Sequence, residues 1–416
     1  MKVAIIGSGI AGNVVAHHLH AAHDITVFEA AGHIGGHTHT HTVELDGERH
    51  AIDTGFIVYN DWTYPNFIAL LNELGVESQP SAMSFSVRNE ASGLEYNGTT
   101  LNTLFAQRRN LLRPSFHRMV RDILRFNHIA PELLEAANEI CLGDYLAAGK
   151  YSPQFINNYL IPMGAAIWST DPTRMLSFPA RYFVQFFHNH GMLSVDKRPQ
   201  WRAIRGGSAR YVEKLTAPFR QRIHLNCPVE SVRRLPNGIL IKPRGTDTER
   251  YDQVFFTCHS DQALALLADA SPLEKSILGV IPYQENEAVL HTDTTLLPRT
   301  RRAWAAWNYH VIEGTDAARA ILTYNMNILQ TLKSRHTFCV TLNRTAHIAP
   351  RKIIKRITYH HPLYTLAGVA AQARQSEING VNRSYFCGAY WRFGFHEDGV
   401  VSALNALKHF EQAAHA

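Results

Sequence analysis

Glycines near the N-terminus have the spacing of a dinucleotide-binding loop. Gly7, Gly9 and Gly12 follow the apolar segment 3–6, and this pattern predicts a strand that runs into a turn and a helix. The first glycine permits the tight turn, the second lets the backbone approach a pyrophosphate, and the third lets the helix pack on the strand. Glu29 ends the next predicted strand, seventeen residues after Gly12, where a carboxylate can bind the ribose hydroxyls of adenosine. The positions expected to contact this half of the cofactor are Gly7, Gly9, Ile10, Ala11, Gly12, Glu29 and Ala30.

A second pair of glycines follows Glu29 almost at once. Gly35 and Gly36 stand where a nicotinamide-binding domain would normally continue to its next helix. This arrangement resembles the extended signature of FAD enzymes in the flavin amine oxidase, phytoene desaturase and protoporphyrinogen oxidase superfamily. The resemblance implies that the pair lies beside the pyrophosphate and ribityl chain of FAD, together with His37 and Thr38. Relatives usually carry an arginine after the pair, so His37 departs from the pattern at this contact.

Later segments resemble further elements of the same superfamily. Residues 53–56 resemble an acid-x-glycine element near the flavin, residues 205–208 a third glycine element, and residues 229–232 a strand edge beside adenine. The chain closes with a strand, a glycine, a loop and a predicted helix, 400–413. The N-terminus of such a helix stabilises the negative charge of a reduced flavin. The further positions that the resemblance assigns to FAD are Gly55, Gly207, Val229, Gly388, Ala389, Glu397, Asp398, Gly399 and Val400.

Ala389 is a second departure from the superfamily pattern. Relatives usually carry Asp or Glu directly after the glycine that stands at position 388 in this chain. Glu397 or Asp398 is therefore expected to have taken over a ribityl or cap contact. The alternative is that Asp398 only caps the final helix.

The strands and helices predicted around these residues indicate an α/β protein. We expect a Rossmann-like FAD-binding domain of the glutathione-reductase-like type, interrupted by a mixed helical and sheet (α+β) substrate domain. The FAD-binding domain is assigned to residues 1–60, 200–272 and 366–416, and the substrate domain to residues 61–199 and 273–365. Within the first, residues 223–225, 229–232 and 238–242 are expected to form one short sheet.

Three segments narrow the resemblance and suggest a substrate. Residues 291–293, 324–327 and 394–399 are similar to a bacterial subgroup known as predicted NAD/FAD-binding or amine oxidase-like proteins. That subgroup is associated with cyclopropane-fatty-acid-synthase-like methyltransferases and, in some members, with oxidation or desaturation of methylated fatty acyl chains. The resemblance implies FAD-dependent dehydrogenation of an apolar, lipid-like substrate, with hydride transfer to flavin N5. The chain has no second GxGxxG loop, so oxygen or a quinone is the expected electron acceptor.

Two other functions stay open. The first is a flavin amine oxidase that acts on a primary or secondary amine, and the second is a non-catalytic FAD-binding protein. Amine oxidases of the superfamily commonly carry a lysine near flavin N5, in the strand that corresponds to residues 287–291. This chain has no lysine between Lys275 and Lys333, which makes the amine oxidase reading weaker.

Four residues are candidates for the catalytic cavity, namely His396, His291, Tyr324 and Trp307. His396 precedes the final predicted helix and is expected closest to the flavin ring, where a histidine can accept a proton near neutral pH. The alternative is that His396 only forms hydrogen bonds within its loop.

Composition excludes several other classes of protein. The five cysteines form no CxxC pair, which argues against a disulfide framework or a cysteine-based metal site. His37, His39 and His41 alternate and would share one face of a strand, but no cysteine or carboxylate stands near them, so we expect no metal. The net charge of +6 is modest, and no zinc-finger or RNA-binding pattern occurs, so nucleic acid is not an expected partner. No signal peptide or membrane span is expected, which predicts a cytoplasmic protein.

One segment, residues 104–126, predicts contact with the inner face of an anionic membrane. It carries six arginines against the single acid Asp122, and Pro114 is expected to divide it into two helices. A helix with a basic face and an apolar face can lie on an anionic bilayer. The alternative is that the apolar face packs into the substrate domain and the arginines face solvent. The oligomeric state is not predicted.

Overall fold

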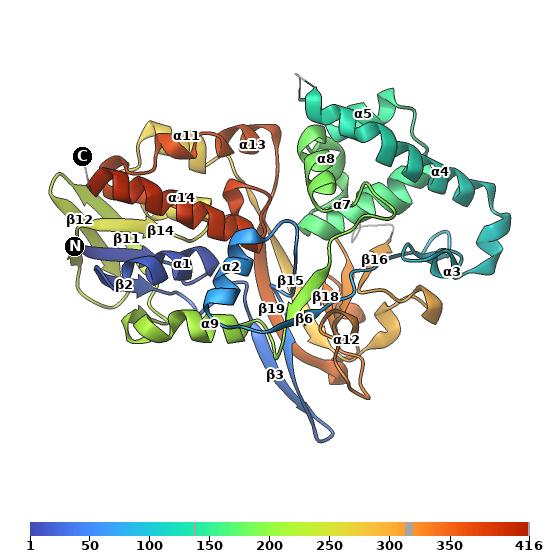
Figure 1. Ribbon diagram of the computed structural model, residues 1–416, viewed down its shortest axis with the longest axis horizontal. Helices are drawn as coiled ribbons and strands as arrows, with labels where there is room; N and C mark the ends of the chain where they lie inside the picture. Colours follow the sequence, from blue (N-terminus) through green and yellow to red (C-terminus); the bar gives the residue numbers. More distant parts are fainter. Residues whose placement is uncertain (137–138, 313–318, 415–416) are drawn as a thin grey trace.

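The fold was analysed in a computed structural model that describes residues 1–136, 139–312 and 319–414 (Figure 1). Residues 137–138 and 313–318 of the predicted substrate domain, and residues 415–416 of the predicted FAD-binding domain, lie outside this description. Within the described chain, no helix is long and apolar enough to cross a membrane.

A parallel five-stranded sheet forms the centre of one half of the molecule. Its strand order is β10 (Ile223–His224), β2 (Asp24–Phe28), β1 (Lys2–Ile6), β14 (Gln253–Phe256) and β20 (Ser384–Phe386). Val3 and Ile5 pack on one side with helices α1 (Ile10–Leu19) and α14 (His396–Ala414). Ala4 and Ile6 pack on the opposite side. Because both faces are covered, β1 is buried almost throughout, as expected for a central parallel strand.

Smaller elements complete this half. A three-stranded sheet, β11 (Val229–Leu235), β12 (Gly238–Pro243) and β13 (Glu249–Tyr251), covers the second face. The remaining elements are the hairpin β3 (Thr40–Leu45) and β4 (Glu48–Asp53), and helices α9 (Ala209–Thr216), α10 (Ser260–Leu266), α11 (Pro272–Leu278) and α13 (Leu366–Gln372). The expectation that residues 223–225 join the sheet of β11 and β12 is wrong, because β10 instead pairs in parallel with β2.

The other half is built on a seven-stranded sheet. Its order is β19 (Ile353–Pro362), β15 (Tyr283–His291), β18 (Cys339–Leu342), β17 (Leu322–Asn325), β16 (Trp307–Val311), β7 (Phe85–Asn89) and β8 (Leu94–Asn97). The helices of this half are α3 (Leu101–Leu104), α4 (Pro114–Ile129), α5 (Leu142–Ala148), α6 (Pro153–Phe155), α7 (Ile161–Trp168), α8 (Ala180–Asn189) and α12 (Met326–Leu329). The strands β15 and β19 run from the first half into the second (Figure 1). The predicted α/β class with a mixed substrate domain is therefore confirmed.

Two segments between the halves differ from the simplest expectation. Helix α2 (Pro65–Glu73) lies in the predicted substrate domain, yet its Phe67 packs in the same core as α1 and α14. The strands β5 (Val58–Asn60), β9 (Trp201–Ile204) and β6 (Ser78–Pro80) form a small sheet across the predicted boundary. The segment in which the chain leaves the first half (β5) is thus paired with the segment in which it returns (β9).

Candidate cofactor and substrate site

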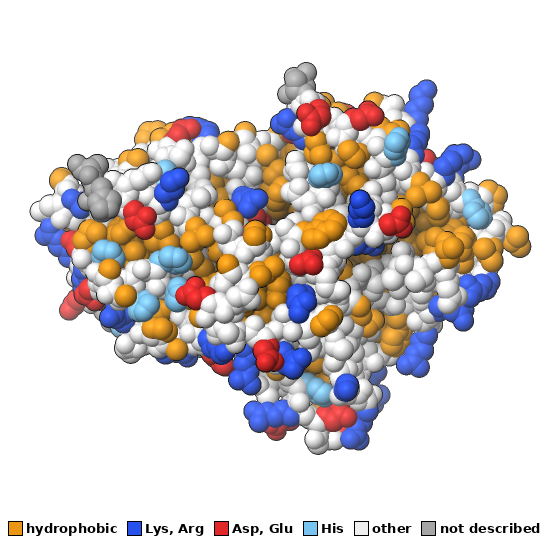
Figure 2. Space-filling view, viewed as in Figure 1, with side chains coloured by type: hydrophobic (Ala, Val, Ile, Leu, Met, Phe, Trp, Pro, Cys, Tyr) orange, Lys and Arg blue, Asp and Glu red, His pale blue; other side chains and the backbone are white. Residues whose placement is uncertain are grey.

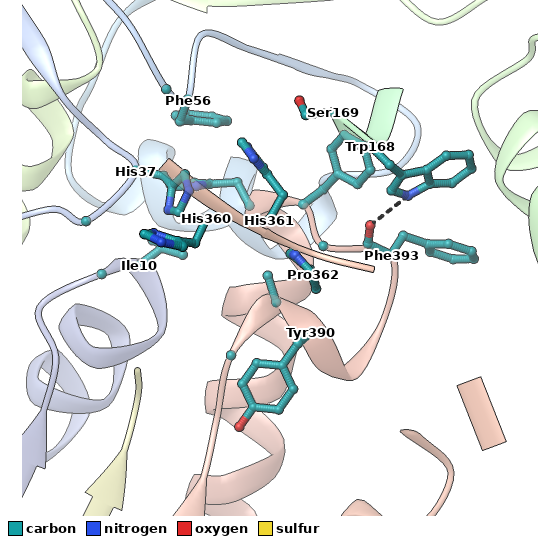
Figure 3. A pocket seen from close by; sticks show the side chains of 18 of the residues that line it. Ile10, His37, Phe56, Trp168, Ser169, His360, His361, Pro362, Tyr390 and Phe393 are labelled. Carbon is teal, nitrogen blue, oxygen red and sulfur yellow. Dashed lines mark hydrogen bonds between the residues drawn. The ribbon is translucent and has the colours of Figure 1, made fainter. Parts of the chain in front are cut away.

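A cavity of about 930 Å³ lies between the two halves and receives side chains from both. It runs from Glu29 and Val229, beside the parallel sheet, to Trp307 and Tyr324 on the seven-stranded sheet. Figure 3 shows part of its wall, where the N-terminus of α1, the end of β19 and the loop before α14 converge. The predicted site residues that line it are Gly7, Gly9, Ile10, Ala11, Glu29, Ala30, Gly35, Gly36, His37, Gly55, Val229, Trp307, Tyr324, Gly388, Ala389 and His396.

The first glycine motif forms a cradle at the N-terminus of α1. Gly7 has φ of +110°, which favours glycine, and it makes the turn from β1 into the helix. A Cβ on Gly12 would lie 2.1 Å from the carbonyl oxygen of Gly7, so Gly12 lets the helix approach the strand. A Cβ on Gly9 would meet nothing within 4 Å and would project into free space, and Gly9 lines the cavity. The open face of Gly9 and the unsatisfied N–H groups of the helix start fit a pyrophosphate.

Glu29 is held beside this cradle. Its carboxylate accepts hydrogen bonds from the backbone N–H of Ser8 (2.9 Å), the Ser8 hydroxyl (2.6 Å) and the backbone N–H of Ala31 (2.8 Å). These bonds tie the end of β2 to the glycine loop, so Glu29 also has a structural role that the motif alone did not reveal.

The acid-x-glycine element and the third glycine element meet at Asp53. Its buried carboxylate accepts from the backbone N–H (2.9 Å) and the hydroxyl (2.8 Å) of Ser208, which follows Gly207. Gly207 has φ of +94°, and its Cβ would lie 2.5 Å from the Thr40 side chain, so it permits packing against the β3–β4 hairpin. Burial raises the pKa of Asp53 to about 6. The acid-x-glycine element at residues 53–56 and the third glycine element at residues 205–208 are thus joined through this carboxylate, a link that sequence reasoning missed.

Several residues predicted to contact FAD have other positions. The predicted site residues that are absent from the described cavity lining are Gly12, Thr38, Gly207, His291, Glu397, Asp398, Gly399 and Val400. Gly399 and Val400 pack against α1, because a Cβ on Gly399 would lie 2.6 Å from the Ile10 side chain and Val400 belongs to the same core. The hydroxyl of Thr38 lies 2.7 Å from the hydroxyl of Tyr211. These residues pack against the elements that form the cavity wall and do not line the cavity themselves.

The carboxylates of Glu397 and Asp398, at the start of α14, both accept hydrogen bonds from backbone N–H groups of the protein. Glu397 accepts from the backbone N–H (3.1 Å) and the side-chain amide (2.6 Å) of Asn66, and from the backbone N–H of Phe67 (2.9 Å). It therefore caps the N-terminus of α2, and Glu397 is absent from the described cavity lining. Asp398 accepts from the backbone N–H of Phe395 (2.9 Å), as its capping alternative proposed, and burial raises its pKa to about 7.

His37, which stands where relatives usually carry an arginine, faces a group of other rings. Its ring centroid lies 4.9 Å from that of Tyr359, 5.5 Å from that of His361 and 6.3 Å from that of His259. Nε2 of His37 is buried and has no hydrogen-bond partner within the described structure. Burial, followed by the neighbouring histidines, lowers the pKa of His37 to about 4. This free ring nitrogen beside the cradle fits a polar group of a dinucleotide.

The expected histidine face divides into two groups. His37 lies in the turn before β3, whereas the ring of His39 stacks on that of His33 at 3.9 Å and contacts that of His41 at 4.1 Å. The expectation that His37, His39 and His41 share one strand face is therefore wrong. Within the described residues, no group of three or more His, Cys, Asp or Glu side chains is arranged to hold a metal ion.

His396 lines the cavity at the start of α14. Its ring stacks on Phe56 with 3.7 Å between centroids, and its Nε2 lies 2.7 Å from the Tyr211 hydroxyl. Burial lowers the pKa of His396 to about 3, so the ring is neutral and weakly basic at neutral pH. The contacts support the alternative in which His396 positions its loop, and its acid–base role stays a prediction.

His291 does not belong to the cavity wall. It is buried in the seven-stranded sheet, where its Nε2 lies 2.7 Å from the Thr341 hydroxyl and its Nδ1 accepts from the backbone N–H of Asp293 (3.0 Å). The prediction that His291 lines the catalytic cavity is wrong, because this end of β15 is buried inside the sheet and Tyr283, at the other end of the strand, is the only β15 residue of the described lining.

The far part of the cavity is an aromatic chamber. Trp307 and Tyr324 are cross-strand partners on β16 and β17, and their rings meet edge to face at 5.3 Å. The indole N–H of Trp168 donates to the carbonyl oxygen of Phe393 (3.2 Å) and joins α7 to the loop before α14 (Figure 3). The other large apolar side chains of the chamber are Met83, Phe85, Tyr159, Met163, Ile167, Phe186, Met192, Trp201, Tyr364 and Phe395.

Charged groups are scarce along the cavity. Among the described lining residues, Glu29 is the only Asp or Glu and Arg198 is the only Lys or Arg. Glu29 belongs to the cradle, whereas Arg198 stands in the same chain segment as the lining residues Pro199, Gln200 and Trp201. Sequence reasoning missed Arg198, which stands in no motif.

A glycine cradle on a parallel sheet that opens into an aromatic chamber defines an FAD-dependent oxidoreductase fold. Residues 10–289 match the family model for flavin-containing amine oxidoreductases, and the chain belongs to this family. Its cofactor is FAD, which confirms the prediction from the second glycine pair. The residues that would hold it are those of the cradle, with Glu29 at the ribose end. A search of curated protein sequences finds no match.

Solved structures with the same fold are distant in sequence. Cyclohexylamine oxidase from Brevibacterium oxydans IH-35A superposes with a TM-score of 0.72 at 16% identity, covering 99% of both chains. A candidate protoporphyrinogen oxidase from Exiguobacterium sp. 255-15 gives 0.72 at 17% identity, covering 99% of this chain and 98% of the other. A fatty acid isomerase from P. acnes that produces CLA gives 0.67 at 15% identity, covering 98% of both chains. These proteins share the fold, although their names indicate different substrates.

Proposed function

We propose that the protein dehydrogenates an apolar, lipid-like substrate with an anionic group, such as a modified fatty acyl chain that bears a free carboxylate. The observation that carries the proposal is the lining of the chamber, which is aromatic and methionine-rich and has Arg198 as the only Lys or Arg among the described lining residues. An apolar chain gains free energy when it leaves water for such a chamber. A guanidinium matches a carboxylate in charge and shape.

Arg198 is available for this contact. Its side chain is exposed, and its Nε donates to the backbone carbonyl of Ser194 (3.2 Å). Among the described residues, no hydrogen bond of its two terminal nitrogens is recorded, so both can bind a carboxylate. Burial raises the pKa of Tyr159 in the chamber, and the positive charge of Arg198 opposes that rise. Arg198 therefore acts electrostatically on the chamber wall, and the same field would favour a bound anion.

A cationic amine lacks a carboxylate partner in the described lining of this chamber. Glu29 is the only carboxylate among the described lining residues, and its oxygens already bind Ser8 and Ala31 at the adenosine end. An ammonium group would meet Arg198 instead. Amine oxidation is still the second candidate, because the family model and the similarity to cyclohexylamine oxidase favour it.

The contributions of the chain to the reaction are binding, orientation and exclusion of water. Bound FAD supplies the two-electron acceptor that takes a hydride from the substrate. The neutral His396 ring, fixed by Phe56 and Tyr211, holds the loop at the start of α14. The helix start offers N–H groups that stabilise negative charge. The bond between Trp168 and Phe393 closes the wall, and an apolar lining keeps water from the reacting carbon.

Anaerobic flavin reduction tests the proposal with three ligands of equal chain length: a fatty acid, its methyl ester and the corresponding alkylamine. We expect the acid to reduce the flavin. Arg198→Gln should weaken its apparent binding about tenfold, or about 1.4 kcal/mol, while binding of the ester is unchanged. Arg205→Gln is the matched control, because Arg205 is exposed and lies outside the described lining.

Three outcomes would contradict the proposal. Reduction by the alkylamine but not by the acid would identify an amine oxidase. Equal binding of the acid by wild type and Arg198→Gln would remove the anchoring role of Arg198. Failure of all three ligands to reduce a fully loaded flavin would favour the non-catalytic alternative.

A further inference from the structure

One end of the molecule combines unpaired basic charge with exposed leucines. This end, which we term the basic tip, comprises residues 98–129, with α3, a 3-10 helix (Arg108–Leu112) and α4. As predicted, a new helix begins at Pro114. The arginines of the basic tip are Arg108, Arg109, Arg113, Arg118, Arg121 and Arg125. Figure 2 shows orange apolar side chains flanked by blue basic ones at this end of the molecule.

The acid of the basic tip does not offset this charge at the surface. Asp122 is its only Asp or Glu, and it is buried, where it accepts from the backbone N–H of Ser152 (3.0 Å) and pairs with Arg125 at 3.6 Å. Arg108 and Arg109 donate to amide and carbonyl oxygens, which carry no net charge. These two arginines, with Arg113, Arg118 and Arg121, form no ion pair recorded among the described residues, and all of them except the half-buried Arg113 are exposed.

Core packing explains only part of the apolar surface of the basic tip. Phe116, Met119 and Phe126 on α4 are buried in the core of the substrate half, as one of the two expectations from sequence proposed. The leucines outside that core are Leu101, Leu111, Leu112 and Leu124, with exposed fractions of 76%, 50%, 87% and 51%. Leu111 and Leu112 stand directly between Arg109 and Arg113, so apolar and cationic groups share one short turn. Exposure of these leucine side chains to water is unfavourable, and transferring them to an apolar environment would lower the free energy.

We propose that the basic tip docks on the surface of an anionic phospholipid bilayer, with the exposed leucines in the interfacial layer and the arginines on the headgroups. Charge complementarity favours this occupant, because each nearby arginine strengthens binding to an anionic surface about fivefold. A polyanion such as RNA would satisfy the arginines but would leave the leucines in water. The contact is peripheral, since no helix of the described chain can cross a membrane. The proposal does not depend on which substrate the cavity binds.

Cosedimentation of the FAD-loaded protein with vesicles tests the docking. We expect binding to vesicles that contain phosphatidylglycerol, weak binding to pure phosphatidylcholine, and a decrease of about tenfold or more at high salt. Leu111→Ser with Leu112→Ser should abolish binding through the apolar contact. The combined variant Arg108→Gln, Arg109→Gln, Arg113→Gln, Arg118→Gln and Arg121→Gln should abolish binding, because it removes the electrostatic attraction to the headgroups. The matched controls are Leu366→Ser, which changes a leucine that is 48% exposed on α13, and Arg205→Gln.

Each variant must retain wild-type flavin content and unfolding temperature, so that loss of binding is not loss of fold. Absence of vesicle binding by wild type at low salt would overturn the proposal. Vesicle binding that survives both sets of substitutions would also overturn it. Self-association removed by the leucine substitutions, without vesicle binding, would assign the basic tip to a second copy of the chain instead.

Discussion

Two glycines of the same loop are expected to respond in opposite ways to one added methyl group. Gly12 is enclosed, because a Cβ there would lie 2.1 Å from the Gly7 carbonyl oxygen and 2.6 Å from the Thr257 hydroxyl oxygen. Thr257 is itself fixed, since its single hydroxyl hydrogen lies within reach of two acceptors, the carbonyl oxygens of Ile6 (Oγ1 to O, 2.9 Å) and Gly7 (2.8 Å). The neighbours of Gly12 are therefore backbone atoms and a held side chain, and neither can move aside easily.

Gly12→Ala should destabilise the apoprotein. Overpacking costs about 1–3 kcal/mol, and the better helix propensity of alanine returns about 1 kcal/mol. The difference is a net loss of about 0–2 kcal/mol, and the close contacts of the added methyl group place Gly12→Ala at the upper end of this range. Gly9→Ala should leave the apoprotein within about 0.5 kcal/mol of wild type. At Gly9 the φ of −67° suits any residue and the Cβ would meet nothing within 4 Å.

The order reverses when FAD is added. The methyl group of Gly9→Ala would occupy the open face of the cradle, and we expect FAD affinity to fall at least about tenfold, or about 1.4 kcal/mol. The assays are thermal unfolding of the apoprotein and titration with FAD, followed by flavin fluorescence. Wild-type FAD affinity in Gly9→Ala would refute the placement of the pyrophosphate. Wild-type stability in Gly12→Ala would refute the packing argument.

Three further predictions concern buried polar groups. Burial, with neighbouring histidines, lowers the pKa of His37 to about 4. On acidification the unfolded chain therefore takes up a proton at this histidine first, and up to about 3 kcal/mol of apoprotein stability is lost as the pH falls from 6.5 toward 4. In His37→Gln the unfolding temperature should decrease less steeply with falling pH than in wild type. Glu397→Gln should lower the free energy of unfolding by about 1–3 kcal/mol, because an amide cannot accept all the N–H bonds at the start of α2. Glu411 is exposed on α14, the helix that also carries Glu397, so Glu411→Gln should not change the unfolding temperature. Arg234→Leu should lower the free energy of unfolding by about 3–5 kcal/mol, because it leaves the carboxylate of Glu274 buried without its cation. Adding Glu274→Leu should restore much of this loss, as measured by chemical denaturation. Absence of any recovery in the double variant would contradict the pairing.

The cofactor half could be predicted from sequence because its signals are local. Gly7 needs a positive φ, and the Asp46-Gly47 turn of the β3–β4 hairpin likewise has φ values of +48° and +80°. Such positions are marked by residue type alone, whatever the rest of the chain does. The buried strand at 3–6 and the acid at its neighbour's end fix the same unit within about thirty residues. FAD therefore followed from sequence and resemblance.

The tertiary structure decided where side chains far apart in sequence meet. Glu397 caps α2 across 331 residues, and β10 joins β2 in place of its sequence neighbours. His291 was predicted for the cavity and lies inside a sheet, whereas Arg198, in no motif, is the only Lys or Arg of the described lining. A motif encodes the conformation of its own backbone. The partner of a carboxylate, or the face of a strand that meets a cavity, depends on how separate elements pack, and that is set by the burial of the whole chain.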